Sequence, residues 1–261
     1  MKNELILKSA YKLNGYNAPK WSFCPFYESL LNTAGGVLVS GATGSGKSVV
    51  LNGILLSILG QYKPVSTGSK EECAIFLCDP KRVEFRRYMT VPHIVRYASD
   101  VDAIFNTIDL VIDIMHKRYE QMELDGIVEW DGSKVFLVID EIGHLMLTRR
   151  KDILPRLTDL LLLCRAAGIV VFLASQSPSR RTLPAELTLN ITAKICLKCD
   201  TAIESRQVVG VPGGETLPRH GEAIARTPDG ITRQHIPNCT LEQSKEYISK
   251  IMEITKRCSV F

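Results

Sequence analysis

Short apolar runs alternate with longer segments of helical length along this chain. The runs are five to seven residues long, as buried strands are, and they cover 36–40, 73–78, 135–139, 169–174 and 191–197. The longer segments are apolar or have helical periodicity, and they cover 49–59, 102–122, 152–167 and 241–255. Alternating positions on both sides of Asp229-Gly230 predict a late hairpin.

Continuous apolar strands separated by helices are typical of a parallel sheet that helices cover on both faces. The predicted fold class is therefore α/β, with a parallel core sheet flanked by helices. Ligands of such sheets bind beyond the carboxyl ends of the strands. Polar residues follow four of the predicted strands, at Ser40-Gly41, Asp79, Asp140-Glu141 and Ser175-Gln176. We expect one site to collect them.

The length of 261 residues and the apolar fraction of 45 % fit one large domain with an ordinary core. We expect residues 1–34 to form an N-terminal segment that packs on the core, and residues 35–261 to form the domain itself. No run approaches the roughly 18 apolar residues of a membrane helix, and the first residues lack the apolar stretch of a signal peptide. A cytoplasmic protein is expected, without a membrane segment of its own.

The net charge of +4 permits a nucleic-acid partner without requiring one. Disulfides are not expected among the eight cysteines of a cytosolic chain. Cys196 and Cys199 form the one CxxC pair, and no second pair lies near them to complete a zinc site. Alternation along a strand places two such thiols on opposite sides, so we expect structural cysteines.

The segment Gly41–Ser48 reads GATGSGKS, a complete Walker A motif between a predicted strand and an apolar helix. Its glycines allow backbone N–H groups to point at phosphate oxygens, and the helix that follows adds the positive end of its dipole. Lys47 is expected to reach the β- and γ-phosphates of ATP, and Ser48 to ligate Mg²⁺. The predicted nucleotide-binding residues are Gly41, Ala42, Thr43, Gly44, Ser45, Gly46, Lys47, Ser48 and Val49.

The run VFLVIDE at 135–141 fits a Walker B motif. Asp140 is predicted to hold Mg²⁺ through water, and Glu141 to polarise the attacking water. Two solvated carboxylates are the alternative interpretation, which the complete Walker A motif disfavours. Gln176 ends the next apolar strand, where a polar side chain can sense the γ-phosphate. The predicted catalytic residues are thus Lys47, Glu141 and Gln176.

Two basic segments, Arg149–Lys151 and Arg180-Arg181, follow the predicted strands that end in Glu141 and Gln176. They suit the phosphates of duplex DNA, although solvated loops are an equal alternative. Few aromatic residues lie between them, which disfavours stacking on single strands. An arginine from another subunit completes many P-loop sites, and the candidates are Arg118, Arg165, Arg206 and Lys194.

The motifs resemble those of the motor domain of the FtsK/SpoIIIE family of DNA translocases, and they occur along the chain in the order found in that family. The most distinctive similarity is CRAAGIVVFLASQSPS at 164–179, because generic P-loop proteins lack such a string. The other similar segments are 41–59, 78–85, 91–94, 115–122, 135–146, 191–210 and 219–225. The family often has arginine where Lys194 stands, which puts a trans-acting arginine there in doubt.

The resemblance implies a RecA-like P-loop NTPase that hydrolyses ATP at subunit interfaces. It implies a homo-oligomer, a hexameric ring, with double-stranded DNA in its pore, and leaves room for a recruiting protein partner. The chain shows no counterpart of the membrane segments, linker and winged-helix module of full-length chromosome translocases, so we expect a stand-alone motor of a mobile element, plasmid or phage. Two alternatives stay open: an ATPase that pumps protein, and a nucleotide-dependent assembly switch. The Asp140-Glu141 pair and Gln176 disfavour a small-molecule kinase.

Overall fold

The computed structural model describes residues 24–33, 35–176 and 178–258, and side chains up to residue 253. Its strands are β1 Gly36–Ser40, β2 Lys63–Pro64, β3 Glu72–Cys78, β4 Ile94–Ala98, β5 Lys134–Ile139, β6 Ile169–Ser175, β7 Ala193–Cys196, β8 Glu222–Thr227 and β9 Gly230–His235. Its α-helices are α1 Pro25–Thr33, α2 Lys47–Gln61, α3 Val101–Asp125, α4 Ile142–Leu163, α5 Ala185–Thr188, α6 Ala202–Val209 and α7 Leu241–Cys258. Two 3₁₀ turns, η3 and η4, cover Arg86–Tyr88 and Gly214–Thr216.

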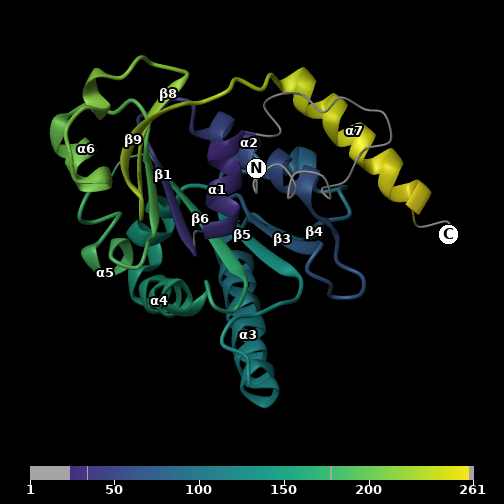
Figure 1. Cartoon of the computed structure of the whole chain (residues 1–261). Coiled ribbons are helices and arrows are strands. Elements are labelled where there is room, and N and C mark those ends of the chain that lie inside the picture. The colour runs from purple at the N-terminus through teal and green to yellow at the C-terminus, as the bar shows by residue number, and fades with distance from the viewer. Residues whose placement is uncertain (1–23, 34, 177, 259–261) are drawn as a thin grey trace.

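The strands form one sheet in the order β2-β3-β5-β6-β1-β7-β8-β9, with β4 also paired to β3 (Figure 1). All pairs from β2 to β7 are parallel, and the hairpin of β8 and β9 adds antiparallel strands at one edge. The predicted parallel α/β fold is therefore confirmed. Strand β6 separates β1 from β5, so the ends of these three strands lie next to one another.

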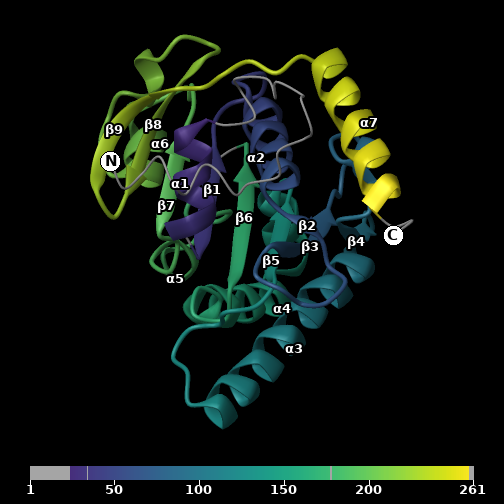
Figure 2. The same cartoon turned by 45° about the vertical axis from the view of Figure 1, so that its right-hand side comes forward.

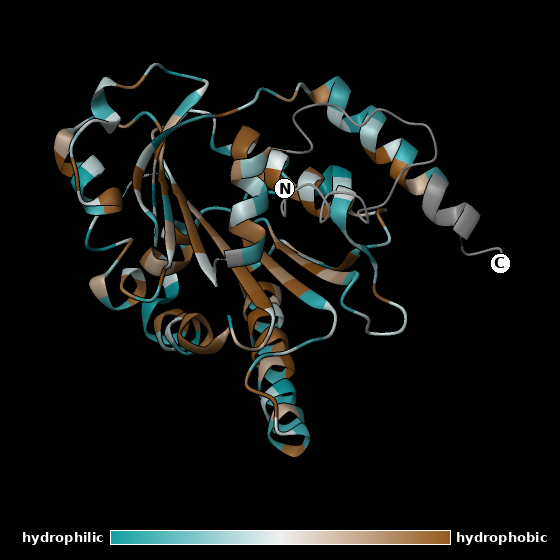
Figure 3. Ribbon diagram, viewed as in Figure 1, coloured by the Kyte–Doolittle hydropathy of each residue, from teal (hydrophilic) through white to brown (hydrophobic). Residues whose placement is uncertain are grey.

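Helices cover both faces of the sheet, with α1, α2 and α7 on one side and α3, α4 and α6 on the other (Figures 1 and 2). Because successive side chains of a strand point to opposite faces, β1 sends Val37 and Val39 into one apolar cluster and Leu38 into the other. The central strands β1, β3, β5 and β6 are hydrophobic along most of their length (Figure 3). They read as continuous apolar runs because both faces are buried.

Helix α2 is the central helix of its face, and every residue from Val50 to Gly60 is buried. Two of its glycines admit tyrosines from neighbouring helices. A Cβ on Gly53 would lie 2.5 Å from the Tyr27 ring of α1, and one on Gly60 would lie 2.5 Å from Tyr247 Oη of α7. The segment 25–33 thus packs on the core. Residues 1–23 lie outside the described residues, so the division at residue 34 stays a prediction.

Helix α3 starts at a capped end and projects past the sheet at its other end (Figures 1 and 2). Within it, Arg118 is buried and its Nη1 donates to Ala167 O at 2.7 Å. Its guanidinium also stacks on Trp130, 4.7 Å from the ring centroid. Arg118 therefore ties α3 to the turn before β6, a role within its own chain that disfavours it as the trans-acting arginine.

Helix α4 begins at Ile142, ten residues before the predicted helix at 152. Ile142, Leu145 and Met146 are buried at helical spacing, but a kink at Arg149 (φ −138°, ψ 39°) shifts the apolar face in the middle of the helix. This shift hides the periodicity of the first half. Strand β4 and helix α6 were not predicted, because the first is partly exposed and the second is short.

The prediction that Cys196 and Cys199 face opposite sides was wrong. Strand β7 ends at Cys196, and the chain then turns so that both Sγ atoms face Gly214, 2.7 and 2.8 Å from where its Cβ would lie. Burial raises the pKa of Cys196 to about 12. Among the described residues no group of three or more His, Cys, Asp or Glu side chains is placed to hold a metal ion.

None of the helices in the described part of the chain is long and apolar enough to cross a membrane.

Candidate nucleotide-binding site

The loop between β1 and α2 carries the Walker A residues. Gly44 (φ +77°) and Gly46 (φ +99°) adopt the left-handed conformation that favours glycine. Gly46 is the N-cap of α2 and offers no side chain to the first N–H groups of the helix. Because these groups have no partner within a helix, the loop and the positive end of α2 form an anion-binding site.

Neighbouring strand ends fix the position of this loop. Gly41 N donates to Ser175 O at 3.3 Å, and Ala42 N donates to Lys198 O at 2.8 Å. The Walker A loop is therefore attached to the ends of β6 and β7.

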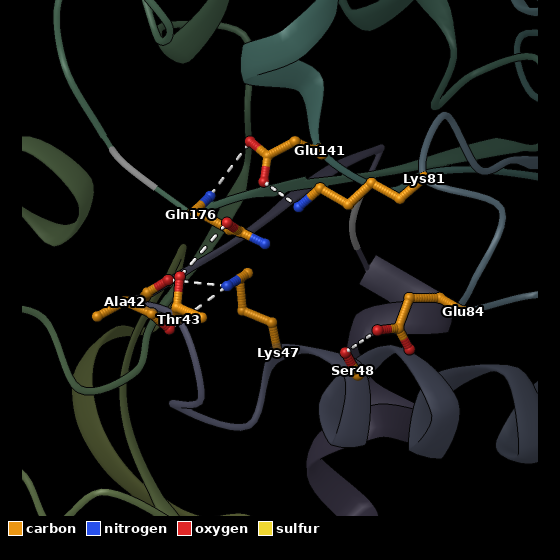
Figure 4. Close-up of polar contacts among 9 residues, drawn as sticks. Ala42, Thr43, Lys47, Ser48, Lys81, Glu84, Glu141 and Gln176 are labelled. Carbon is orange, nitrogen blue, oxygen red and sulfur yellow. Dashed lines mark hydrogen bonds and ion pairs between the residues drawn. The ribbon is translucent and has the colours of Figure 1, made fainter. Parts of the chain in front are cut away.

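Lys47 is buried, and its ammonium is directed back at its own loop (Figure 4). Nζ donates to Gly41 O at 2.9 Å and to Ala42 O at 3.5 Å. Burial lowers the pKa of Lys47, and the negative charge of Glu141 opposes this shift. The hydrogen bonds of this buried cation thus go to carbonyl oxygens of its own loop, a place that a phosphate could take.

Ser48 and Glu84 form a contact that the sequence analysis missed. Ser48 Oγ donates to Glu84 Oε1 at 2.6 Å (Figure 4). Glu84 lies in the loop after β3, whose shape Asp79 determines: Asp79 Oδ2 accepts from Phe85 N at 3.1 Å and from Tyr97 Oη at 3.3 Å. Asp79 is thus a positioning residue for this loop. The sequence signal that could have revealed this contact is Glu84, the acidic residue in the string CDPKRVEF that resembles the family.

Asp140 follows β5 and is 6 % exposed. Burial raises the pKa of this carboxyl to about 6; Lys81 opposes the shift, whereas Glu84, Asp79 and Glu141 add to it. Three neighbouring carboxylates thus oppose the ionised form of this buried carboxyl, and additional positive charge would stabilise it. A bound cation would supply that charge.

Glu141 is the N-cap of α4 and has φ +63°, a strained value for a residue with a side chain. Its Oε2 lies 3.1 Å from Lys81 Nζ, and its Oε1 accepts from Gln176 N at 3.4 Å (Figure 4). Gly143 leaves room for the carboxylate, since a Cβ there would lie 2.9 Å from Glu141 Oε1.

Gln176 links the Walker A loop to Glu141. Its Oε1 lies 3.5 Å from Thr43 Oγ1, while its backbone N–H donates to Glu141. The structure therefore places the predicted residues Lys47, Ser48, Asp140, Glu141 and Gln176 around one site at the carboxyl edge of the sheet. Val49 lies in the first turn of α2 and is half-buried.

The two predicted basic segments lie against each other. Arg150 Nη1 donates to Arg181 O at 3.1 Å, and Lys151 and Arg180 are exposed. Arg149, by contrast, is paired with Asp152 at 2.6 Å.

Of the remaining candidates for a trans-acting arginine, Arg165 and Arg206 are exposed. Lys194 is half-buried, and its pKa is lowered first by burial and then by Arg226.

The fold and the site together define a P-loop ATPase domain. The FtsK/SpoIIIE family profile matches residues 18–135. The DNA translocase FtsK of Sporosarcina ureae is 30 % identical over 214 residues, which are 74 % of this chain and 27 % of that protein. The DNA translocase SpoIIIE of Bacillus subtilis is also 30 % identical over 74 % of this chain, and 26 % of its length is covered. The chain belongs to the FtsK/SpoIIIE family and spans about a quarter of the length of these relatives.

Solved structures share the fold at lower identity. The pCW3 conjugation coupling protein TcpA, solved as a monomer with ATPγS, gives a TM-score of 0.72 at 21 % identity and covers 86 % of this chain and 66 % of its own. EssC ATPases 2 and 3 from Geobacillus thermodenitrificans give a TM-score of 0.73 at 17 % identity, over 85 % of this chain and 44 % of theirs.

Proposed function

We propose that this chain is an ATP-dependent translocase of double-stranded DNA. At its site, Lys47 would exchange the carbonyls of its own loop for the β- and γ-phosphates of ATP. Glu141 would orient the attacking water and accept its proton. Gln176, which contacts both Thr43 and Glu141, would respond to the loss of the γ-phosphate.

Magnesium fits the donors around Ser48. Glu84 accepts a hydrogen bond from Ser48 Oγ, which leaves the lone pairs of this oxygen for a cation, and the buried Asp140 would be stabilised by additional positive charge. Ser48 and, through water, Asp140 would hold Mg²⁺. When bound, the ion neutralises charge on the phosphates.

The observation that carries the DNA assignment is the contact between Arg150 and Arg181. Each belongs to a segment that starts close to a proposed catalytic residue. Glu141 is the N-cap of α4, which contains Arg150, and Arg181 follows Gln176 by five residues in the sequence. A change at the phosphate site is therefore connected through two short paths to one basic surface. Relatives named DNA translocases at 30 % identity support the same proposal.

Assembly belongs to this proposal as well. A homo-oligomeric ring, hexameric by resemblance, would bring a subunit's arginine to its neighbour's site. Sedimentation with and without ATP and duplex DNA tests this part. A cytosolic location and a recruiting protein partner stay predictions from the sequence.

Steady-state ATP hydrolysis with and without linear duplex DNA tests the function. We expect a DNA-dependent rise that Lys47→Ala and Glu141→Gln both abolish, with ATP binding kept in the second variant. Hydrolysis that DNA leaves unchanged at low salt, over a range of protein concentrations, would contradict the proposal. It would favour an ATPase that acts on protein or a nucleotide-dependent assembly switch.

A further inference from the structure

Arg219 lies beside the middle of the Walker A loop. It belongs to the loop between η4 and β8, far from Gly44 in the sequence. A Cβ on Gly44 would lie 2.9 Å from Arg219 Nη2 and 3.6 Å from its Nε. The planar guanidinium therefore contacts the fourth residue of the phosphate loop from within the same chain.

Among the residues that the structure describes, no carboxylate lies within ion-pair distance of Arg219. Arg149, Arg156 and Arg233 each have an acidic partner within ion-pair distance. Within the described ranges, Arg219 has none, and its side chain is exposed. An unpaired guanidinium next to a loop of phosphate-binding geometry is positioned for an anion.

Hydrogen bonds attach the Arg219 loop to the Walker A loop through the residues that follow β7. Lys198 O accepts from Ala42 N of the Walker A loop, and Lys198 Nζ donates to Glu215 O. Cys199 N donates to Gly214 O at 3.3 Å. These bonds hold the η4 turn, which ends three residues before Arg219, at a set distance from the phosphate loop.

We propose that Arg219 is a cis-acting arginine of the ATPase site, which contacts the β-phosphate of bound ATP. The inference rests on the proposed role of Gly41–Ser48 as the phosphate loop and is independent of DNA translocation. The middle of such a loop surrounds the β-phosphate, and the guanidinium fork matches phosphate oxygens. Arginines supplied in cis or in trans stabilise the charge of phosphoryl transfer.

The Arg219 guanidinium is suited to ATP hydrolysis as well as to nucleotide binding. During hydrolysis the water oxygen bonds to the γ-phosphorus, Glu141 accepts the water proton, and the bond to the β–γ bridging oxygen breaks. ADP keeps that bond's electron pair, so negative charge grows on the β-phosphate. A guanidinium at this place strengthens its interaction as the bond breaks.

Three substitutions test the proposal in the full chain: Arg219→Gln, Arg219→Lys, and the exposed Lys117→Gln on α3 as a control for lost charge. Fluorescent ADP titrations and ATP turnover are measured for each. We expect Arg219→Gln to weaken ADP binding several-fold and to lower kcat at least ten-fold. Arg219→Lys should keep most of the binding and lose most of the turnover, while Lys117→Gln matches the parent. Circular dichroism checks folding, and if Arg219→Gln does not fold, Arg219→Lys alone decides.

The Lys47→Ala variant distinguishes an error in the assignment of the phosphate loop from an error in the role of Arg219. If it leaves nucleotide binding intact, the phosphate loop itself is wrongly assigned. If it abolishes binding while both Arg219 variants retain parental ADP affinity and kcat within two-fold, the role of Arg219 alone is overturned.

Mixed subunits test the action in cis. In a mixture of the Arg219→Gln and Lys47→Ala variants, no single chain carries both Arg219 and Lys47. If Arg219 acts in cis, ATP turnover should therefore stay low at every mixing ratio. Recovery on mixing would show that Arg219 serves a neighbour and would contradict the cis assignment.

Discussion

Lys81 Nζ and Glu141 Oε2 are 3.1 Å apart, so the proposed catalytic carboxylate is engaged by a lysine from the loop after β3. The other carboxylate oxygen of Glu141 accepts the backbone N–H of Gln176. Each carboxylate oxygen keeps a second acceptor site for a water, but the ion pair with Lys81 withdraws negative charge from the proposed base. A γ-phosphate carries more negative charge than a carboxylate and would compete with Glu141 for Lys81.

Glu141→Gln should therefore have two opposite effects. We expect ATP turnover to fall at least 100-fold, which is the scale of a lost general base. We expect ATP affinity to rise roughly three- to ten-fold, because a negative charge close to Lys47 and Lys81 is removed. Titration with a fluorescent ATP analogue and a single-turnover assay measure the two quantities.

The Lys81→Met change tests the source of the tighter binding. Introduced into Glu141→Gln, it should cancel most of the gain in ATP affinity, since the freed ammonium is gone. The two single variants and the double variant form a thermodynamic cycle. A coupling of zero within error would mean that Lys81 does not respond to Glu141.

Glu84 should control the response to magnesium. Its carboxylate accepts a hydrogen bond from Ser48 Oγ at 2.6 Å, and removing a partner that orients a metal ligand typically weakens metal binding 10- to 100-fold. We expect Glu84→Gln to raise the Mg²⁺ concentration for half-maximal turnover about ten-fold, with a much smaller change in ADP affinity measured in EDTA. The exposed Glu71→Gln is the matched control, and an unchanged Mg²⁺ titration for Glu84→Gln would refute this role.

The motif residues of this site were predictable because each motif is contiguous and follows a strand. Lys47, Asp140, Glu141 and Gln176 all follow strand ends, and parallel strands bring those ends together. Glu84 and Arg219 were not singled out, because their contacts join loops that are 36 and 175 residues away from Ser48 and Gly44 in the sequence. No local pattern records such pairs.

The errors of the fold prediction also have local causes. Alternation placed Cys196 and Cys199 on opposite faces, but it holds only while the strand continues, and β7 ends at Cys196. The start of α4 was predicted too late, because the kink at Arg149 divides its apolar face. In both places the backbone departs from regular strand or helix geometry, whereas a prediction from sequence periodicity assumes that this geometry continues.

Glu72 should make stability depend on pH at a point far from the nucleotide site. Burial alone would raise the pKa of its carboxyl, but hydrogen bonds from Ser66, Gly68 and Thr67 outweigh it and lower the pKa from 4.5 to about 2. A carboxyl with a depressed folded pKa stabilises the protein above its unfolded pKa and loses this contribution as the pH falls from 4.5 toward 2. Urea unfolding of Glu72→Gln should show a loss of about 2 kcal/mol at pH 7.

The neighbouring residue provides the control for Glu72. Glu71 pairs with Lys63 at the surface, with 65 % of its side chain exposed, and such pairs contribute less than about 1 kcal/mol. Glu71→Gln should change the free energy of unfolding very little at both pH 7 and pH 4. The difference between the Glu72 variant and the parent should shrink at pH 4; a constant difference from pH 7 to pH 4 would mean that the hydrogen bonds to the ionised carboxylate are not its source.

The surface formed by Arg150, Lys151, Arg180 and Arg181 should determine the salt dependence of DNA binding. Phosphate contacts release counterions, and each contact adds about 0.9 to the slope of log K against log salt. Arg180→Gln combined with Arg181→Gln should therefore weaken binding to duplexes of unrelated sequence by a similar factor and reduce that slope by up to about 2. Lys70→Gln combined with Lys117→Gln removes the same charge from exposed positions elsewhere. A general loss of positive charge affects both double variants alike, so equal slopes for the two would rule out this surface as the DNA-binding site. A reduced slope for the arginine variant alone would place the DNA beside the segment that leads from Gln176 to Arg181.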